Sequence, residues 1–227
     1  MKALLLILLF WLPLRQESNL EVLVACRTPE IFNNYRNYNF KQEIKNGRNG
    51  LNVRIKSQTL DFKNLNHVLA SDGAYMAGQD PAIRTIFSQL RQNAISVGDY
   101  LRNLSIFLSD SISYSEADFP QDTRAVLLSR KAHCIGYANV AQTLLACAGI
   151  VSRPVNGFYL RENNAIIEPV PHRWLVIDLP GERRVFYDPQ YQDFSSRYLV
   201  TDQSVAFNRI ERFMGIIVKK NKKIMDE

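Results

Sequence analysis

The chain has 227 residues, of which 46% are hydrophobic and 22% are charged, and its formal net charge is +6. These values fit a globular protein with one sizeable core and exclude a chain that is disordered throughout. The three cysteines have no CxxC spacing, which excludes a disulfide framework and, with only three histidines, argues against a structural zinc site. We therefore expect no metal and no other cofactor.

The N-terminus, MKALLLILLFWLPLRQES, joins a positive start at Lys2 to an apolar run from Ala3 to Leu14. This run is too short to span a bilayer and fits the centre of a secretory signal. We predict that residues 1–17 are a signal peptide and that the protein is exported, to the periplasm or out of the cell. The alternatives are a short buried helix and, less favoured, a lipid-modified Cys26, which RQESNLE separates from the apolar run.

Two segments carry little functional signal. Residues 18–79 have no assigned role, and residues 27–60, rich in Asn, Lys, Arg and Tyr, predict loop with one strand at LNVRIK. Residues 201–227 end in the basic tail VKKNKKIMDE, which we interpret as a solvated terminus. Contact with an anionic membrane through this tail or the N-terminus is the alternative. We find no nucleic-acid-binding motif.

Helical spacing begins at Asp80. Apolar residues recur at intervals of three and four up to Asp110 and predict two helices joined near 92–96. Asp80 before Pro81 is a typical helix start. A further helix is predicted over 134–148, with Gly149 at its end.

Strand signals follow this helix. VSRPVNGFYL has a turn signal at Asn156–Gly157, and RWLVID and RRVFYD form the two arms of a hairpin around LPGE. Helices followed by strands predict an α+β fold in which the helix at 134–148 packs on an antiparallel sheet, preceded by a helical subdomain. We assign this domain to residues 80–200.

Cys134 opens its predicted helix, where free backbone N–H groups and the helix dipole favour a thiolate. A cysteine nucleophile also needs a base and a group that orients the base. His133 projects about 100° away from Cys134 on the helix, and His67 has no acidic partner. We interpret both as surface or capping residues.

His172 has a carboxylate partner in the predicted hairpin. A hairpin centred on Pro180 pairs residues whose numbers add to 360, which places His172 opposite Asp188. We therefore predict a triad of Cys134 as nucleophile, His172 as general base and acid, and Asp188 as the residue that orients His172. Asp178 is a less favoured carboxylate because it lies beside the turn. Cys147 lies about 20 Å further along the helix and is interpreted as a small core residue.

The segments HCIGYANVAQTLLACAGIVSRPVNGFY, PHRWLVID and FYDPQ, in this order, resemble the transglutaminase-like superfamily of papain-like thiol enzymes. In that family a cysteine opens a helix, AGIxxR leads into a strand, a tryptophan follows the histidine by two residues, and a proline follows the aspartate. The resemblance covers roughly residues 95–195. His133 departs from the small residue that usually precedes the nucleophile.

This resemblance implies a papain-like core and thioester chemistry on the amide of a protein or peptide substrate. Water as the second acceptor would make the protein a peptidase or amidase, towards which we lean, whereas an amine would make it a crosslinking transferase. No calcium-binding acidic loop is evident. Tyr114 is a candidate oxyanion residue, with a core aromatic as its alternative. The competing class of function is a non-catalytic module that binds a protein or the cell envelope.

Overall fold

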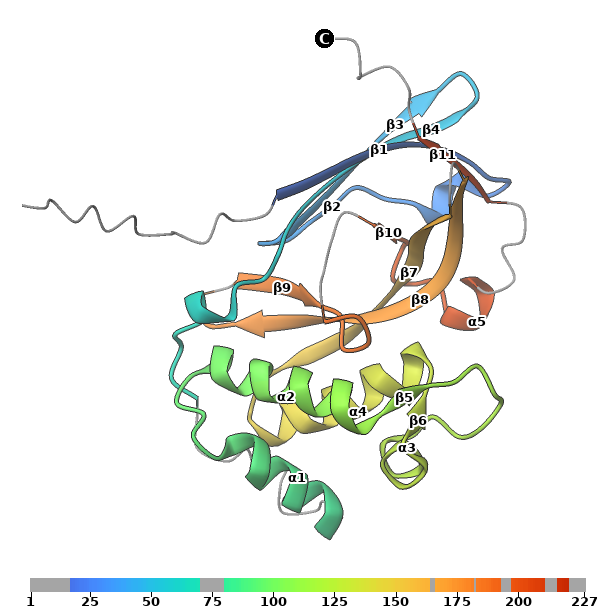
Figure 1. Ribbon diagram of the computed structural model, residues 1–227. Helices are drawn as coiled ribbons and strands as arrows, with labels where there is room; N and C mark the ends of the chain where they lie inside the picture. The colour runs from blue at the N-terminus through green and yellow to red at the C-terminus, as the bar shows by residue number, and fades with distance from the viewer. Residues whose placement is uncertain are drawn as a thin grey trace, which may run out of the picture.

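The computed structural model describes residues 17–69, 80–163, 166–181, 183–192, 197–210 and 216–220. Its helices are α1 (Pro81–Arg91), α2 (Val97–Ser111), α3 (Thr123–Ser129), α4 (Cys134–Cys147) and α5 (Phe207–Ile210). Figure 1 shows α1, α2, α3 and α4 gathered on one side of a large curved sheet. The predicted α+β fold, with its helix packed on an antiparallel sheet, is confirmed.

Within the described residues the main sheet has nine strands in the order β10-β7-β8-β11-β1-β4-β3-β2, with β9 also paired to β8. The strands are β1 (Glu17–Ala25), β2 (Tyr35–Arg36), β3 (Phe40–Gly47), β4 (Gly50–Gln58), β7 (Ser152–Asn163), β8 (Ile166–Leu179), β9 (Arg183–Tyr187), β10 (Tyr198–Val200) and β11 (Ile217–Lys220). Two short strands, β5 (Ser113–Tyr114) and β6 (Lys131–Ala132), pair separately in parallel.

The sheet folds back on itself, so that β1–β4 form a layer over β7, β8 and β10 (Figure 1). Side-chain hydrogen bonds link these two parts of the folded sheet. The Gln42 amide of β3 donates to the Val200 carbonyl of β10 at 2.9 Å and accepts from the Val200 N–H at 2.8 Å. The buried Asn39 makes the same pair of bonds with the backbone of Phe186 in β9, at 3.0 and 2.8 Å.

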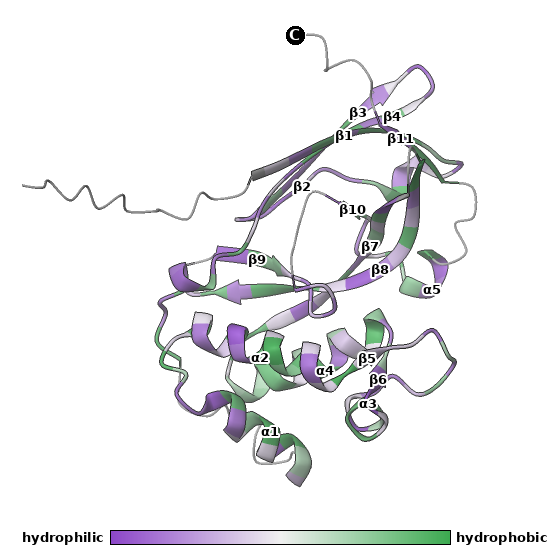
Figure 2. Ribbon diagram, in the orientation of Figure 1, coloured by the Kyte–Doolittle hydropathy of each residue, from purple (hydrophilic) through white to green (hydrophobic). Residues whose placement is uncertain are grey.

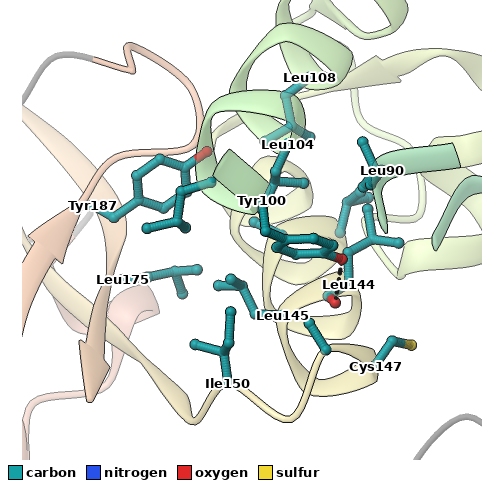
Figure 3. Packing of buried hydrophobic residues seen from close by; sticks show 14 of the residues in the cluster. Leu90, Tyr100, Leu104, Leu108, Leu144, Leu145, Cys147, Ile150, Leu175 and Tyr187 are labelled. Atoms are coloured by element: carbon teal, nitrogen blue, oxygen red, sulfur yellow. Dashed lines mark hydrogen bonds between the residues drawn. The ribbon is translucent and has the colours of Figure 1, made fainter. Parts of the chain in front are cut away.

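Strand β8 lies between two hydrophobic cores. Leu175 and Ile177 face the helices and pack in the cluster of α1, α2 and α4, which Figure 3 shows from close by. Trp174 and Val176 face the other way, into the space enclosed by the folded sheet. Green and purple segments accordingly alternate along many elements in Figure 2. Because successive side chains of a strand point to opposite faces, β8 contributes residues to both cores.

The helix predictions are confirmed. Helix α1 ends at Arg91 and α2 begins at Val97, so the two are joined by residues 92–96 as predicted. The Asp80 carboxylate caps α1 by accepting from the Ala82 N–H at 2.8 Å. Helix α4 begins at Cys134, and Gly149 adopts a positive φ of 69° just beyond its end. A glycine in this conformation is the usual helix terminator.

Two strand predictions are wrong. The strand predicted at LNVRIK is confirmed as part of β4, but the rest of residues 27–60 is not mainly loop: β3 pairs with β4 in a hairpin, in which buried Leu51, Val53 and Ile55 of β4 alternate with exposed polar residues. The exposed face of this hairpin is polar, so the composition of the segment was typical of loop. Asn156–Gly157 is not a turn but lies inside the continuous strand β7. Gly157 is required there by crowding, because a Cβ would lie 2.2 Å from the Leu199 carbonyl oxygen and 2.7 Å from the Trp174 ring.

The predicted hairpin register is also wrong, by two residues. Leu179 pairs with Arg183 and Val176 with Phe186, so that paired numbers add to 362 rather than 360. The turn needs three residues between the strands, with Gly181 at a positive φ of 77°. Because the shift is even, every side chain stays on its predicted face.

The remaining predictions concern the N-terminal and C-terminal segments of the chain. The apolar run of the predicted signal peptide and residues 221–227 of the basic tail lie outside the described residues. In the segment 18–79, strands β1–β4 belong to the main sheet, and β11 pairs with β1. No helix in the described ranges is long and apolar enough to cross a membrane.

Candidate active site

Helix α4 presents Cys134 in its first turn, directly after the short strand β6. His133 is the N-cap, and its Nδ1 accepts a hydrogen bond from the Ile135 N–H at 3.3 Å. The capping interpretation of His133 is therefore confirmed. The cysteine is largely buried, with 8% of its surface exposed. It thus lies where unpaired N–H groups of the helix favour negative charge.

The side chains of His133 and His172 and the backbone N–H of Arg173 lie close enough to the Cys134 thiol to stabilise its thiolate. Burial acts to raise the pKa of Cys134, but these groups and the charge of His172 outweigh it and lower the pKa to about 7. A substantial thiolate fraction at neutral pH follows. The interpretation of His133 as a capping residue missed its effect on the thiol, whose pKa it helps to lower.

His172 and Asp188 form a buried pair: Nε2 of the imidazole lies 2.6 Å from Oδ2 of the carboxylate. Since Asp188 engages Nε2, Nδ1 is the ring nitrogen that remains for Cys134. Burial acts to lower the pKa of His172, but the charge and hydrogen bond of Asp188, with a contribution from Cys134, raise it above its ordinary value. The arrangement favours a thiolate–imidazolium pair.

Asp188 reaches His172 differently from the prediction. Pairing of β8 with β9 ends at Leu175 and Tyr187, so the two residues are not directly opposed. Asp188 begins the turn after β9 and reaches back along the shared face of the sheet. The register differs from the predicted one by two residues, so His172 and Asp188 still lie on the same face of the sheet. The predicted pair is therefore present although the predicted register was wrong.

The Asp188 carboxylate is held by four donors. Its Oδ1 accepts from the N–H groups of Gln190 at 2.8 Å and Tyr191 at 3.2 Å. Its Oδ2 accepts from the Tyr198 hydroxyl at 2.6 Å as well as from His172. Burial acts to raise the pKa of Asp188, but the charge of His172 and the hydrogen bonds from these donors hold the pKa below its usual value. The carboxylate therefore stays ionised at neutral pH.

Four aromatic rings surround the imidazole of His172. Their centroids lie 5.3–6.1 Å from it, and the residues are Tyr159, Trp174, Tyr191 and Tyr198. Tyr191 is 43% exposed and forms the outer wall, whereas Trp174 and Tyr198 are fully buried. These rings restrict the rotation of the imidazole and exclude water from the His172–Asp188 pair.

Tyr114 lies near the nucleophile but is not a core aromatic. Strand β5 pairs Tyr114 with Ala132, two residues before Cys134. Its side chain is 52% exposed and its hydroxyl donates to Glu116 at 3.3 Å. Partial burial and the Glu116 carboxylate raise the pKa of Tyr114. Its role at an oxyanion stays a prediction.

The remaining candidate residues lie away from the thiol. Cys147 is fully buried in the helix core, shown in Figure 3, and burial raises its pKa to about 11. Asp178 pairs with Arg153 at 3.0 Å and Arg184 at 3.5 Å, near the far end of β8. Among the described residues no group of three His, Cys, Asp or Glu side chains could hold a metal ion.

Sequence reasoning missed Tyr198, Tyr191 and Gly157. Gly157 pairs directly with His172 across β7 and β8, and Tyr198 pairs with Tyr159 across β10 and β7. No local pattern marks these residues, because their roles arise from strand pairing. The pair Asn156–Gly157 suggested a turn, whereas the glycine actually makes room for Trp174.

Comparison with known proteins found one family model and several solved structures that are similar to this chain. Residues 84–189 match the model of the transglutaminase-like superfamily. A candidate cysteine protease from Cytophaga hutchinsonii is 10% identical over 90% of this chain and 84% of that chain, with a TM-score of 0.46. The periplasmic domain of TgpA from Pseudomonas aeruginosa is 15% identical over 78% of this chain and 88% of that chain, with a TM-score of 0.45. A TGase is 17% identical, over 65% of this chain and 43% of that chain, with a TM-score of 0.41. No curated protein matches the chain significantly.

Proposed function

We propose that the protein is a Cys–His–Asp thiol enzyme, from the geometry around Cys134 and from the match of residues 84–189 to the transglutaminase-like superfamily. The observation that carries the proposal is that buried His172 is hydrogen-bonded to Asp188 at 2.6 Å and lies close enough to Cys134 for each to shift the pKa of the other. Such an arrangement supplies a nucleophile, a base and the residue that orients the base.

The proposed reaction begins when the Cys134 thiolate attacks the carbonyl carbon of a peptide or side-chain amide. Backbone N–H groups of the first turn of α4 stabilise the resulting oxyanion. The carbon–nitrogen bond then breaks, His172 gives its proton to the leaving amine, and an acyl-thioester remains on Cys134. In the second half His172 takes a proton from the acceptor, the acceptor attacks the thioester carbonyl carbon, and the carbon–sulfur bond breaks to release the Cys134 thiolate.

We propose water as the acceptor, which makes the protein a peptidase or amidase. The alternative acceptor is a primary amine, which would make it a crosslinking transferase. Incubation with casein and a biotinylated primary amine distinguishes the two: new peptide ends or free ammonia without biotin incorporation support hydrolysis, and biotin incorporation contradicts it.

The thiol enzyme itself is tested by iodoacetamide labelling between pH 5 and pH 9, followed by mass spectrometry of each cysteine peptide. We expect Cys134 to react with a midpoint near pH 7, set by its lowered pKa. Cys147, whose thiol is buried and has a pKa of about 11, serves as an internal control and should stay unlabelled. His172→Ala should slow labelling of Cys134 at pH 7 by about tenfold or more. Equal labelling in both proteins would point instead to a non-catalytic binding module.

We also propose that the protein is exported, on the basis of Lys2 and the apolar run that follows it. The mass of the protein recovered from cells tests this. A chain shortened to begin near residue 18 supports export, and an intact chain in the cytosol contradicts it.

A further inference from the structure

Tyr198 contacts the proposed active site from outside the residues that match the family model. It lies in β10, is fully buried, and its hydroxyl donates to Oδ2 of Asp188 at 2.6 Å. The same oxygen lies 2.6 Å from Nε2 of His172. We propose that Tyr198 is a positioning residue of this site, held in place by Gln42 of the N-terminal strands. The inference rests on the proposed function.

The hydrogen bonds of Asp188 show what Tyr198 contributes. Both backbone donors, from Gln190 and Tyr191, bind Oδ1. They fix only Oδ1, so the position of Oδ2, the oxygen that faces His172, depends on its own partners. The Tyr198 hydroxyl binds the other oxygen and so fixes the plane of the carboxylate. That plane sets the direction in which His172 Nε2 is held, and thereby the position of Nδ1 relative to Cys134.

Tyr198 is itself held from two sides. Its ring packs against Trp174 at 5.2 Å and Tyr159 at 5.4 Å between centroids. Strand β10 has only three residues paired with β7, and its other side is bound by the two Gln42 bonds to Val200. Gln42 is 1% exposed and also donates to the Asn33 carbonyl at 2.8 Å. Through Gln42, the N-terminal strands thereby hold β10, the strand that carries Tyr198.

The hydroxyl also affects ionisation. A hydrogen bond to a charged group stabilises it more than a neutral one does. Removing the Tyr198 hydroxyl therefore raises the pKa of Asp188. A carboxylate that is no longer held in its plane also stabilises the His172 imidazolium less well, so the pKa of Cys134 rises and its thiolate is lost at a higher pH than in the wild type.

The test compares Tyr198→Phe with Tyr100→Phe. Tyr100 is also fully buried, and its hydroxyl makes a bond of 2.7 Å to the Leu144 carbonyl, away from the triad. Both variants lose one buried hydrogen bond. We expect Tyr198→Phe to slow iodoacetamide labelling of Cys134 at pH 7 by about tenfold and to move the acid limb of its pH profile upward. Tyr100→Phe should leave rate and profile unchanged.

The outcomes separate this inference from the proposed function. If His172→Ala slows labelling but Tyr198→Phe behaves like Tyr100→Phe, the role of Tyr198 is overturned while the thiol enzyme stands. If His172→Ala has no effect, the proposed function fails first. Circular dichroism and urea unfolding show whether Tyr198→Phe remains folded, so that a slow rate in a folded protein supports the proposal.

Gln42→Leu tests the second part of the proposal. Leucine is close in size to glutamine but cannot bond to Val200. We expect slower Cys134 labelling and an upward shift of the acid limb, both smaller than in Tyr198→Phe. An unchanged pH profile in folded Gln42→Leu would overturn the anchoring role of the N-terminal strands.

Discussion

At the scale of single residues, ionisation in the site depends on one buried carboxylate. Asp188 lies 2.6 Å from His172 and raises the pKa of the imidazole above its ordinary value. His172 in turn contributes to the lowered pKa of Cys134. The charge on Asp188 therefore controls the thiol through the imidazole, although Asp188 does not contact the reacting atoms.

Asp188→Asn keeps the shape of the side chain and removes its charge. Without the carboxylate the pKa of His172 falls, the imidazolium is lost, and the pKa of Cys134 rises towards its ordinary value. We expect the labelling midpoint of Cys134 to move upward from pH 7 and the rate at pH 7 to fall by about tenfold or more. Ultraviolet titration of the thiolate provides the measurement, and an unchanged midpoint would contradict the role of Asp188.

At the scale of elements, the site lies where α4 meets the strongly curved strand β8. Helix α4 brings Cys134, β8 brings His172, and the turn after β9 brings Asp188. The approach of β10 to β7 requires Gly157, because neither the Leu199 carbonyl nor the Trp174 ring leaves space for a Cβ. Local strand packing therefore determines where Tyr198 and His172 lie.

Gly157→Ala should disturb both stability and reactivity. The added methyl group must displace β10 backbone or the Trp174 ring, which costs about 1–3 kcal/mol of unfolding free energy. We expect slower labelling of Cys134 because β10 carries Tyr198. Gly181→Ala is the control: it has open space but a φ of 77°, so it should cost about 1 kcal/mol and leave labelling unchanged. Equal labelling rates in the two variants would contradict this account.

At the scale of the whole molecule, the two cores share β8 and should unfold together. Ile55 is fully buried in the core enclosed by the folded sheet, and Leu104 is fully buried in the helix core. Alternate β8 residues belong to each core, so neither can lose its packing without exposing the other side of the same strand.

Ile55→Ala and Leu104→Ala should each lower the free energy of unfolding by about 2–5 kcal/mol. We expect one urea transition in both variants, with fluorescence and far-ultraviolet circular dichroism in coincidence. Lys56→Ala, at an exposed position next to Ile55, should change stability by less than about 0.5 kcal/mol. Two separate transitions would show that the cores are independent.

The sequence by itself determined the elements that depend on neighbouring residues. Capping at Asp80, helical spacing in α1, α2 and α4, and the Pro180–Gly181 turn all act within a few residues. They were enough to select Cys134, His172 and Asp188 as candidates, although the register that paired the last two was wrong. An even error in register left both side chains on the same face.

Only the tertiary structure decided what surrounds these candidates. The Gln42–Val200 bonds join residues 158 positions apart, and the Tyr198–Asp188 bond depends on the pairing of β10 with β7. Such contacts leave no periodic pattern in the chain, because they result from the folding of the sheet rather than from local conformational preference. The catalytic candidates can therefore be predicted from the sequence. Their orientation depends on how the main sheet folds back on itself.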